Sequence, residues 1–430
     1  MVKLSKRLLA LAVWVFAALS ATGAIADPLF GDGGVSAFYS WGGKVPSKPG
    51  TFLRKEAMDA APYVQASVAE RILYTSRDAF DKNRTIVVSG RLFLPKGTPP
   101  KGGWPVMSWG HPTTGVADVC APSWKGDGAD EIAMIDAWLA AGFAVVATDY
   151  QGLGTEGPHP YLLFRPEGIG ILDAARVALK MYPGKLANKI VTAGFSQGSG
   201  AALGAAWLAP SYAPDLKLVG AIATGLVVET NHPGAAPQVA TPPFADEDGS
   251  IEAAFEMLFL IGTAPALDKG FQPESALLPA GRSILKTTQT SCFGSVVREA
   301  VKDKLDYRDV PGTTNIFTAD YAKTVEKIEQ ASPFENAHFT VPVLTLTGLA
   351  DEWAPISRQY NFISAMCYAG TTVEAHYYPG ETHDSAVNAS LPETLRFAKA
   401  VVTGAPVTGN CSTLVPPQQT PSRIPSDRRQ

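Results

Sequence analysis

The fold of this chain is decided by residues 189–200, which read Lys-Ile-Val-Thr-Ala-Gly-Phe-Ser-Gln-Gly-Ser-Gly. The β-branched residues Ile190 and Val191 predict a strand, and the small residues that follow position 200 predict a helix. Between them, Gly194 to Gly198 form the pattern G-x-S-x-G, in which a very tight turn exposes a serine hydroxyl at the end of a strand. The stretch therefore predicts a strand–turn–helix unit with Ser196 at its corner.

Short apolar runs and helical patterns alternate on both sides of this unit. Further strands are expected at 104–109, 143–148, 218–223, 341–346 and 372–377, and a hairpin is expected from 69–74 and 85–94. Helices are expected at 130–141, 167–181, 356–368 and 391–402. This alternation predicts an α/β fold with a mostly parallel central sheet flanked by helices.

The alternation stops between residues 229 and 333, where helices are expected at 251–261, 283–305 and 319–330. The first of these is apolar nearly all round, so it is buried or lies over something apolar. We expect residues 229–333 to form an inserted helical cap or lid on a core made of 27–228 and 334–414. The alternative is extra helical packing with no role in access. Residues 415–430 have few apolar side chains and are expected to form a disordered tail.

Residues 1–26 have the pattern of a signal peptide. Lys3, Lys6 and Arg7 precede an apolar run at 8–19 that is too short to span a bilayer, and 24–26 read Ala-Ile-Ala. We expect a secreted or periplasmic protein cleaved near Ala26, the alternative being an uncleaved anchor. No later run of 18 apolar residues is present, so no transmembrane helix is expected in the mature chain.

Charge and cysteine content exclude several classes of function. The formal net charge is −4 and there is no basic cluster, which argues against nucleic-acid binding. No two cysteines form a C-x-x-C pair, which argues against zinc and dithiol redox sites. In an exported chain, four cysteines suggest two disulfides with three possible pairings, and buried free thiols are the alternative. The cysteines are Cys120, Cys292, Cys367 and Cys411.

In α/β proteins with a parallel sheet, functional sites lie at the carboxyl ends of the strands, and the candidate residues of this chain follow such ends. Asp351 follows the strand at 341–346 and His383 follows the strand at 372–377, so the chain order is serine, acid, histidine. His383 would take the Ser196 proton and Asp351 would orient the imidazole, with Glu352 as a neighbouring alternative to Asp351. No metal ligand is needed for this chemistry.

An oxyanion hole would require two donors near Ser196. The first is the backbone N–H of Gln197, the residue after the serine. The second would come from the loop after the strand at 104–109, where Thr113 and Thr114 are the candidates. His111 adjoins this turn and could shape it, whereas His159, His232, His338 and His376 are expected to be surface or structural residues.

Several longer motifs identify a family resemblance. They are Cys120-Ala-Pro-Ser123, Glu167-Gly-Ile-Gly-Ile-Leu-Asp173, Gly194–Gly198, Ser211-Tyr-Ala-Pro-Asp-Leu216, Asp351-Glu-Trp-Ala-Pro355 and Tyr378-Pro-Gly-Glu-Thr-His383. With them, residues 50–416 resemble the secretory lipases of the α/β-hydrolase fold, which include fungal lipase A-type enzymes and bacterial relatives.

The resemblance implies a triad of Ser196, Asp351 and His383, an oxyanion donor near Thr114, and a helical lid. It also implies the disulfides Cys120–Cys292 and Cys367–Cys411, and the hydrolysis of carboxylic esters including acylglycerols. One departure is Pro112, which stands where related bacterial sequences often have glycine. Proline has no N–H, so the donor must be Thr113 or a later residue.

These observations predict a serine carboxylesterase or lipase that works through an acyl-enzyme on Ser196, without a metal or organic cofactor. Its substrate would be a small-molecule ester or a lipid, met at a lipid–water interface if the apolar helix at 251–261 forms a lid. The alternatives are an esterase for short-chain, aromatic or polymeric esters, a peptidase, and a catalytically silent binding module. The oligomeric state is left open.

Overall fold

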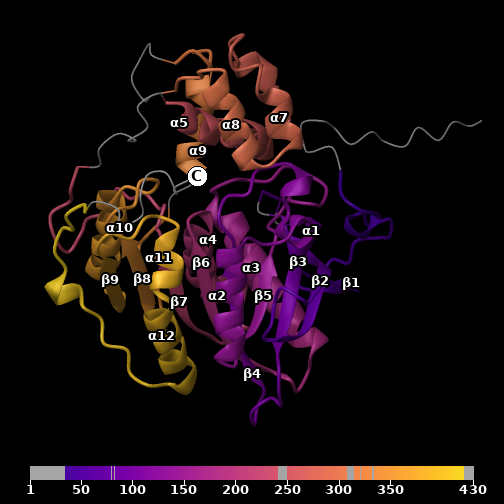
Figure 1. Ribbon diagram of the computed structural model, residues 1–430, viewed down its shortest axis with the longest axis vertical. Coiled ribbons are helices and arrows are strands. Elements are labelled where there is room, and N and C mark those ends of the chain that lie inside the picture. The colour runs from indigo at the N-terminus through magenta and orange to yellow at the C-terminus, as the bar shows by residue number, and fades with distance from the viewer. Residues whose placement is uncertain are drawn as a thin grey trace, which may run out of the picture.

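A computed structural model describes residues 34–78, 80–81, 83–240, 249–307, 314–319, 321–331 and 334–420 of the chain (Figure 1). The predicted signal peptide at 1–26 lies outside the described residues, and so does the last part of the predicted tail, 421–430.

The centre of the fold is a nine-stranded sheet in the order β1-β2-β3-β5-β4-β6-β7-β8-β9. Its strands are β1 (Phe52–Ala57), β2 (Ala66–Arg77), β3 (Thr85–Pro95), β4 (Trp104–Gly110), β5 (Ala144–Thr148), β6 (Leu186–Phe195), β7 (Leu218–Thr224), β8 (Val343–Gly348) and β9 (Val373–Tyr378). β1 to β3 are antiparallel to their neighbours, and the strands from β5 across to β9 run parallel. The predicted α/β class with a mostly parallel sheet is confirmed.

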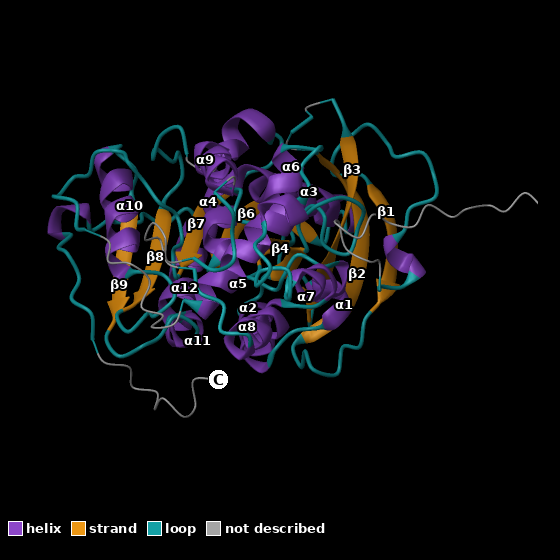
Figure 2. Cartoon of the chain, turned by 90° about the horizontal axis from the view of Figure 1, so that it is seen from above, coloured by secondary structure: helices purple, strands orange, loops and turns teal. Residues whose placement is uncertain are grey.

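Helices cover both faces of the sheet (Figure 2). One face carries α3 (Phe164–Met181), α4 (Gln197–Tyr212) and α10 (Ile356–Tyr368), and the other carries α2 (Ala129–Ala140), α11 (Ser385–Ala389) and α12 (Leu391–Thr403). Successive side chains of a strand point alternately to the two faces of the sheet. Ile190 packs with α3 and α4, while Val191 packs with α2 and α12, as the two-residue period of a strand requires.

The strand β1 is absent from the predicted elements. Its sequence, Phe-Leu-Arg-Lys-Glu-Ala, has no apolar alternation because the strand lies at the edge of the sheet and none of its residues is buried.

The helices that follow β7 and precede β8 in the sequence form a group that lies over the carboxyl ends of the parallel strands (Figure 1). We call this group the cap: α5 (Ser250–Leu258), a π-helical turn (Phe259–Thr263), α6 (Ala264–Leu267), α7 (Leu285–Thr290), α8 (Phe293–Lys302) and α9 (Tyr321–Ala331). The cap has its own apolar core, in which Met257, Val296 and Phe317 are buried. The single helix expected at 283–305 is two helices, because Cys292 is extended and its side chain is held in a disulfide.

The stretch Ser250–Leu267 is long and apolar enough to cross a membrane by length and composition, with a mean hydropathy of 1.4. No such run is predicted from the sequence. Since 61% of it is buried within the protein, the apolar residues are accounted for by packing in the cap.

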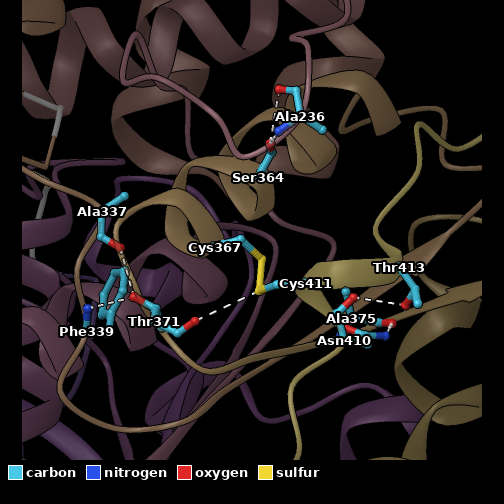
Figure 3. The surroundings of a disulfide bond; sticks show 10 residues. All are labelled: Ala236, Ala337, Phe339, Ser364, Cys367, Thr371, Ala375, Asn410, Cys411 and Thr413. Carbon is cyan, nitrogen blue, oxygen red and sulfur yellow. Dashed lines mark hydrogen bonds between the residues drawn. A yellow bond between two sulfur atoms is a disulfide. The ribbon is translucent and has the colours of Figure 1, made fainter.

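Two disulfides join Cys120 to Cys292 and Cys367 to Cys411, the pairing that the family resemblance implies. The first links the core to the cap, and the second links the end of α10 to the segment after α12 (Figure 3). No free cysteine remains in the described part of the chain.

The beginning of the predicted tail does not behave as composition suggests. The backbone N–H of Thr420 donates to the Leu349 carbonyl, and the N–H of Gly380 donates to Thr420 Oγ1. Thr420 therefore contacts the loops that follow β8 and β9 through hydrogen bonds, which do not require apolar side chains.

Candidate active site

Ser196 occupies a strained corner between β6 and α4. Its φ of 53° and ψ of −121° are unusual for a residue with a side chain. The flanking glycines are required by packing: a Cβ at Gly194 would lie 1.9 Å from the Gly198 carbonyl oxygen, and one at Gly198 would lie 1.9 Å from that of Gly110. Close packing of β6, α4 and β4 thus fixes the turn that the G-x-S-x-G pattern predicts.

Asp351 and His383 are brought together from the loops after β8 and β9. The His383 Nδ1 lies 2.8 Å from Asp351 Oδ2. The other carboxylate oxygen, Oδ1, accepts the backbone N–H groups of Trp353 at 2.9 Å and Ala354 at 2.7 Å, while Gln359 Nε2 donates to Oδ2 at 3.0 Å. Glu352 instead accepts the His383 backbone N–H, at 3.4 Å. Asp351, not Glu352, therefore holds the imidazole ring.

The His383 ring lies beside the turn that bears Ser196, which we call the elbow. It packs on Phe195, the residue before Ser196, with 4.7 Å between ring centroids. Gly225, just after β7, leaves room for the ring, because a Cβ there would lie 2.8 Å from His383 Cε1. Ser196 and His383 line one cavity.

Electrostatics make His383 a stronger base than an ordinary histidine. Burial opposes a charge on the ring, but the charge and hydrogen bond of Asp351 outweigh burial, and Asp384 and Glu352 add to the effect, so the pKa of His383 is raised from 6.5. Because Nδ1 donates to Asp351, Nε2 is the nitrogen available to accept a proton.

The two candidate threonines lie in different surroundings. Thr113 lines the cavity, and its Oγ1 lies 2.8 Å from the hydroxyl of Tyr161. Thr114 faces the cap: its carbonyl accepts the N–H of Phe293 at 2.9 Å, and its buried Oγ1 has no recorded partner within the described residues. Gln197 and Thr113 are thus brought to the cavity, whereas Thr114 is brought to the edge of the cap.

The cavity has a volume of about 580 Å³ and is lined by both core and cap. Three aromatic rings form one wall: Phe255 of α5 lies 4.5 Å from Phe293 of α8 and 5.7 Å from Trp353, measured between centroids. Further apolar lining comes from Phe164, Val227, Phe259, Val325 and Ile328. Such a wall can hold an apolar group next to Ser196.

Three polar residues near the site are not among the catalytic candidates that the sequence suggests: Gln359, His159 and Glu167. Gln359 donates to Asp351, and Gln197 Nε2 contacts His159 Nε2 at 2.9 Å and Glu167 Oε1 at 2.7 Å. His159, expected to be a surface or structural residue, is buried and contacts the Gln197 side chain. In the sequence, this group of residues is indicated by Glu167 alone, because it is an acid in an otherwise apolar helical stretch. Among the described residues, no cluster of histidine, cysteine or acid side chains could hold a metal ion.

The family model named Secretory lipase matches residues 128–410. The chain is 26% identical over 380 residues to a protein named "Probable inactive lipase MT1628" of Mycobacterium tuberculosis, covering 84% of this chain and 80% of that one. It is also 26% identical over 389 residues to "Secreted triacylglycerol lipase LIP5" of Malassezia globosa, covering 85% and 77%.

Solved structures show the same fold. Candida antarctica lipase A in its closed state aligns with a TM-score of 0.65 at 20% identity, covering 90% of this chain and 91% of that one. The rice cell wall degrading esterase LipA of Xanthomonas oryzae aligns with a TM-score of 0.59 at 16% identity, covering 83% and 98%. With an α/β-hydrolase fold and a family match over most of its length, the chain belongs to the secretory lipase family and is a carboxylic ester hydrolase.

Proposed function

We propose that this protein is a secreted lipase or esterase that cleaves esters through an acyl-enzyme on Ser196, with acylglycerols as the substrate type. The observation that carries the proposal is the 2.8 Å contact between His383 Nδ1 and Asp351 Oδ2 at the cavity that Ser196 also lines. An acid, an imidazole and a serine on a strained turn are the parts that nucleophilic catalysis requires.

In this mechanism, Ser196 Oγ attacks the ester carbonyl while His383 Nε2 takes its proton. The oxyanion forms near the N–H of Gln197 and the Thr113 loop, which supply the donors. His383 then gives its proton to the leaving alcohol, and an acyl group stays on Ser196. A water molecule, deprotonated by His383, releases the acid and restores the serine.

The cap is proposed to act as a lid. The lid comprises residues 229–333, and it covers a core made of residues 27–228 and 334–414. Its α5 and α9 line the cavity, so they would contact the acyl chain. The α8 side of the cap is joined to the core by the Cys120–Cys292 disulfide and by the hydrogen bond from the Phe293 N–H to the Thr114 carbonyl. Any opening of the cap would therefore start on the α9 side.

Export from the cytoplasm is proposed from the signal-peptide pattern, with cleavage near Ala26. Two disulfides suit an oxidising compartment, and one relative carries the word "secreted" in its name. N-terminal sequencing of the mature protein would locate the cleavage site.

The proposed function is tested by hydrolysis of p-nitrophenyl esters from acetyl to palmitoyl, together with labelling by a serine-directed phosphonate. We expect turnover that persists at long acyl chains and a label that maps to Ser196. Activity confined to acetyl and butyryl would leave the nucleophile in place but remove the acylglycerol assignment. An unlabelled, inactive protein would favour the silent binding module; one relative is itself named a probable inactive lipase.

Replacing Trp353 with alanine is expected to lower kcat/KM for a palmitoyl ester about 10-fold, because loss of one aromatic contact removes about 1.4 kcal/mol of binding. The rate on an acetyl ester, whose short acyl group has little surface to place against the ring, should stay within about twofold. Phe52→Ala is the matched control, since Phe52 is 39% exposed on β1, away from the cavity. Equal losses on both esters would show that Trp353 supports the Asp351 loop instead of the acyl chain.

Acidic side chains are expected to make the cavity select against anionic acyl groups. The lining includes two basic residues, Arg358 and His383, and five acidic ones: Glu229, Glu252, Glu256, Glu329 and Asp384. The Arg358 guanidinium is itself paired with Glu229 at 2.8 Å. Negative potential disfavours a carboxylate on the acyl chain and favours departure of the fatty-acid product.

Mono-p-nitrophenyl suberate should therefore react about 10-fold or more slowly than the octanoate at low salt, and salt should narrow the gap. The methyl ester of the suberate, which is equally long and neutral, controls for polarity. Glu329→Gln should raise the rate on the anionic ester alone. Equal rates for the charged and methylated esters at low salt would contradict the expectation.

A further inference from the structure

A buried polar network lies behind the elbow, and the proposed mechanism does not use it. Its members are Gln197 on α4, Glu167 on α3 and His159 on the loop between β5 and α3, each at most 1% exposed. Gln197 Nε2 donates to Glu167 Oε1 at 2.7 Å and contacts His159 Nε2 at 2.9 Å. Burying three polar side chains beside a catalytic turn is costly unless each is satisfied.

The hydrogen-bond partners fix the protonation state of His159. Its Nδ1 lies 3.0 Å from the Gln151 carbonyl oxygen, which can only accept, so the proton is on Nδ1. Burial lowers the pKa of His159 to about 4, and the ring is therefore neutral near neutral pH. Nε2 is then an acceptor, and it takes one N–H of the Gln197 amide while Glu167 takes the other. Both donors of the amide are satisfied, and its orientation is fixed.

Glu167 connects this amide to the wall of the cavity. Its Oε1 also accepts the backbone N–H of Leu162 at 3.0 Å, and Leu162 lines the cavity with a φ of 55°. That conformation is strained for leucine, so the hydrogen bond helps to maintain it. A single carboxyl oxygen therefore joins α4, α3 and the loop that bears Leu162.

The surroundings of Glu167 favour the uncharged form of its carboxyl group. Burial raises the pKa of its carboxyl well above 4.5, although hydrogen bonds from Gln197 and Leu162 oppose the rise. The titratable groups that face it are Tyr150, Tyr161 and, through Gln197, the neutral His159. No ion pair recorded among the described residues includes Glu167. Its Oε2 is buried and has no hydrogen-bond partner among the residues that the structure describes, so a proton would be carried there.

We propose that Glu167, together with His159, is a positioning residue that holds the Gln197 side chain and so aims the Gln197 backbone N–H at the oxyanion. This inference rests on the proposed function, since it takes Ser196 as the nucleophile. The Gln197 backbone and side chain belong to one residue at the first turn of α4, so anchoring the amide limits rotation of the peptide that follows Ser196. Glu167 acts as a neutral acceptor in this role.

The test compares Glu167→Leu, Glu167→Gln and the matched control Asp173→Asn. Asp173 is another buried acid with a raised pKa, two turns further along α3, and its partners Ser76, Arg176 and Tyr212 lie away from the cavity. kcat and KM are measured on p-nitrophenyl butyrate and expressed per site titrated with a phosphonate. This removes any loss caused by misfolded protein.

Glu167→Leu should lower kcat per site about 10- to 100-fold with KM within about threefold, because a misaimed oxyanion donor affects the transition state and not ground-state binding. Glu167→Gln keeps a neutral acceptor and should rescue kcat to within about threefold. Asp173→Asn should keep wild-type kcat per site. Full activity of Glu167→Leu per titrated site, or an equal loss in Glu167→Gln, overturns the proposal. Labelling of the wild-type Ser196 is read separately, so failure of the proposed function remains distinguishable.

Stability gives a second readout. A raised folded-state pKa means that the unfolded chain releases the Glu167 proton first, so stability falls as pH rises from the unfolded pKa toward the folded one. Glutamine does not titrate. The Tm of Glu167→Gln relative to wild type should therefore rise as pH increases above about 5. A constant difference would show an ordinary ionised carboxylate and would overturn the neutral-acceptor role.

Discussion

Replacing Ser196 with alanine is expected to lower kcat about 10⁴- to 10⁶-fold, the loss seen when a triad nucleophile is removed. Alanine keeps the Cβ, so it meets the same backbone strain at φ 53° and the elbow is retained. Stability should change by less than about 0.5 kcal/mol, since only a hydroxyl is lost. The measurement is kcat on p-nitrophenyl octanoate alongside thermal unfolding of the same preparation.

Ser211→Ala is the control for this change. Ser211 lies on the same helix, α4, but is exposed at its far end, where its Oγ donates to the Leu208 carbonyl. Its activity should stay within about twofold of wild type. If Ser196→Ala kept wild-type turnover, the nucleophile would lie elsewhere and both the proposed mechanism and the Glu167 inference would fall together.

Local patterns account for the parts of the site that the sequence predicts. Ser196, Asp351 and His383 each follow a strand whose apolar run is visible in the sequence, and parallel strands bring their carboxyl ends to one edge. The G-x-S-x-G spacing likewise predicts the elbow, because only glycine leaves room for β6, α4 and β4 to approach so closely. Whether these residues catalyse the reaction is what the variants decide.

The features that the sequence does not predict depend on contacts between distant segments. Thr113 and Thr114 are equivalent by position, and only the placement of Tyr161 and Phe293 separates them. Glu167 reads as one acid in a helix until its partner Gln197, 30 residues away, is known. The Thr420 contacts are another case, since their backbone hydrogen bonds leave no side-chain pattern.

Asp351→Asn is expected to lower kcat about 10⁴-fold, and the structure gives the reason. Two backbone N–H groups, from Trp353 and Ala354, donate to Oδ1, so the asparagine oxygen will occupy that position. Its NH₂ group then faces His383 Nδ1, where only an acceptor was suitable. The imidazole must turn Nδ1 into an acceptor and carry its proton on Nε2, where it can no longer take the proton of Ser196.

The pH profile of kcat/KM provides an independent check on the same pair. His383 must be neutral to act as a base, so activity rises as pH increases through its pKa, which lies above 6.5 in the wild type because of Asp351. Removing that charge should move the residual acid limb to lower pH. Glu352→Gln is the matched control, since Glu352 accepts the His383 backbone N–H and contributes less than Asp351 to the raised pKa of His383. The kcat of this variant should stay within about 10-fold of wild type. The opposite order of losses, with Glu352→Gln inactive and Asp351→Asn nearly wild type, would assign the orienting acid to Glu352 in spite of the geometry.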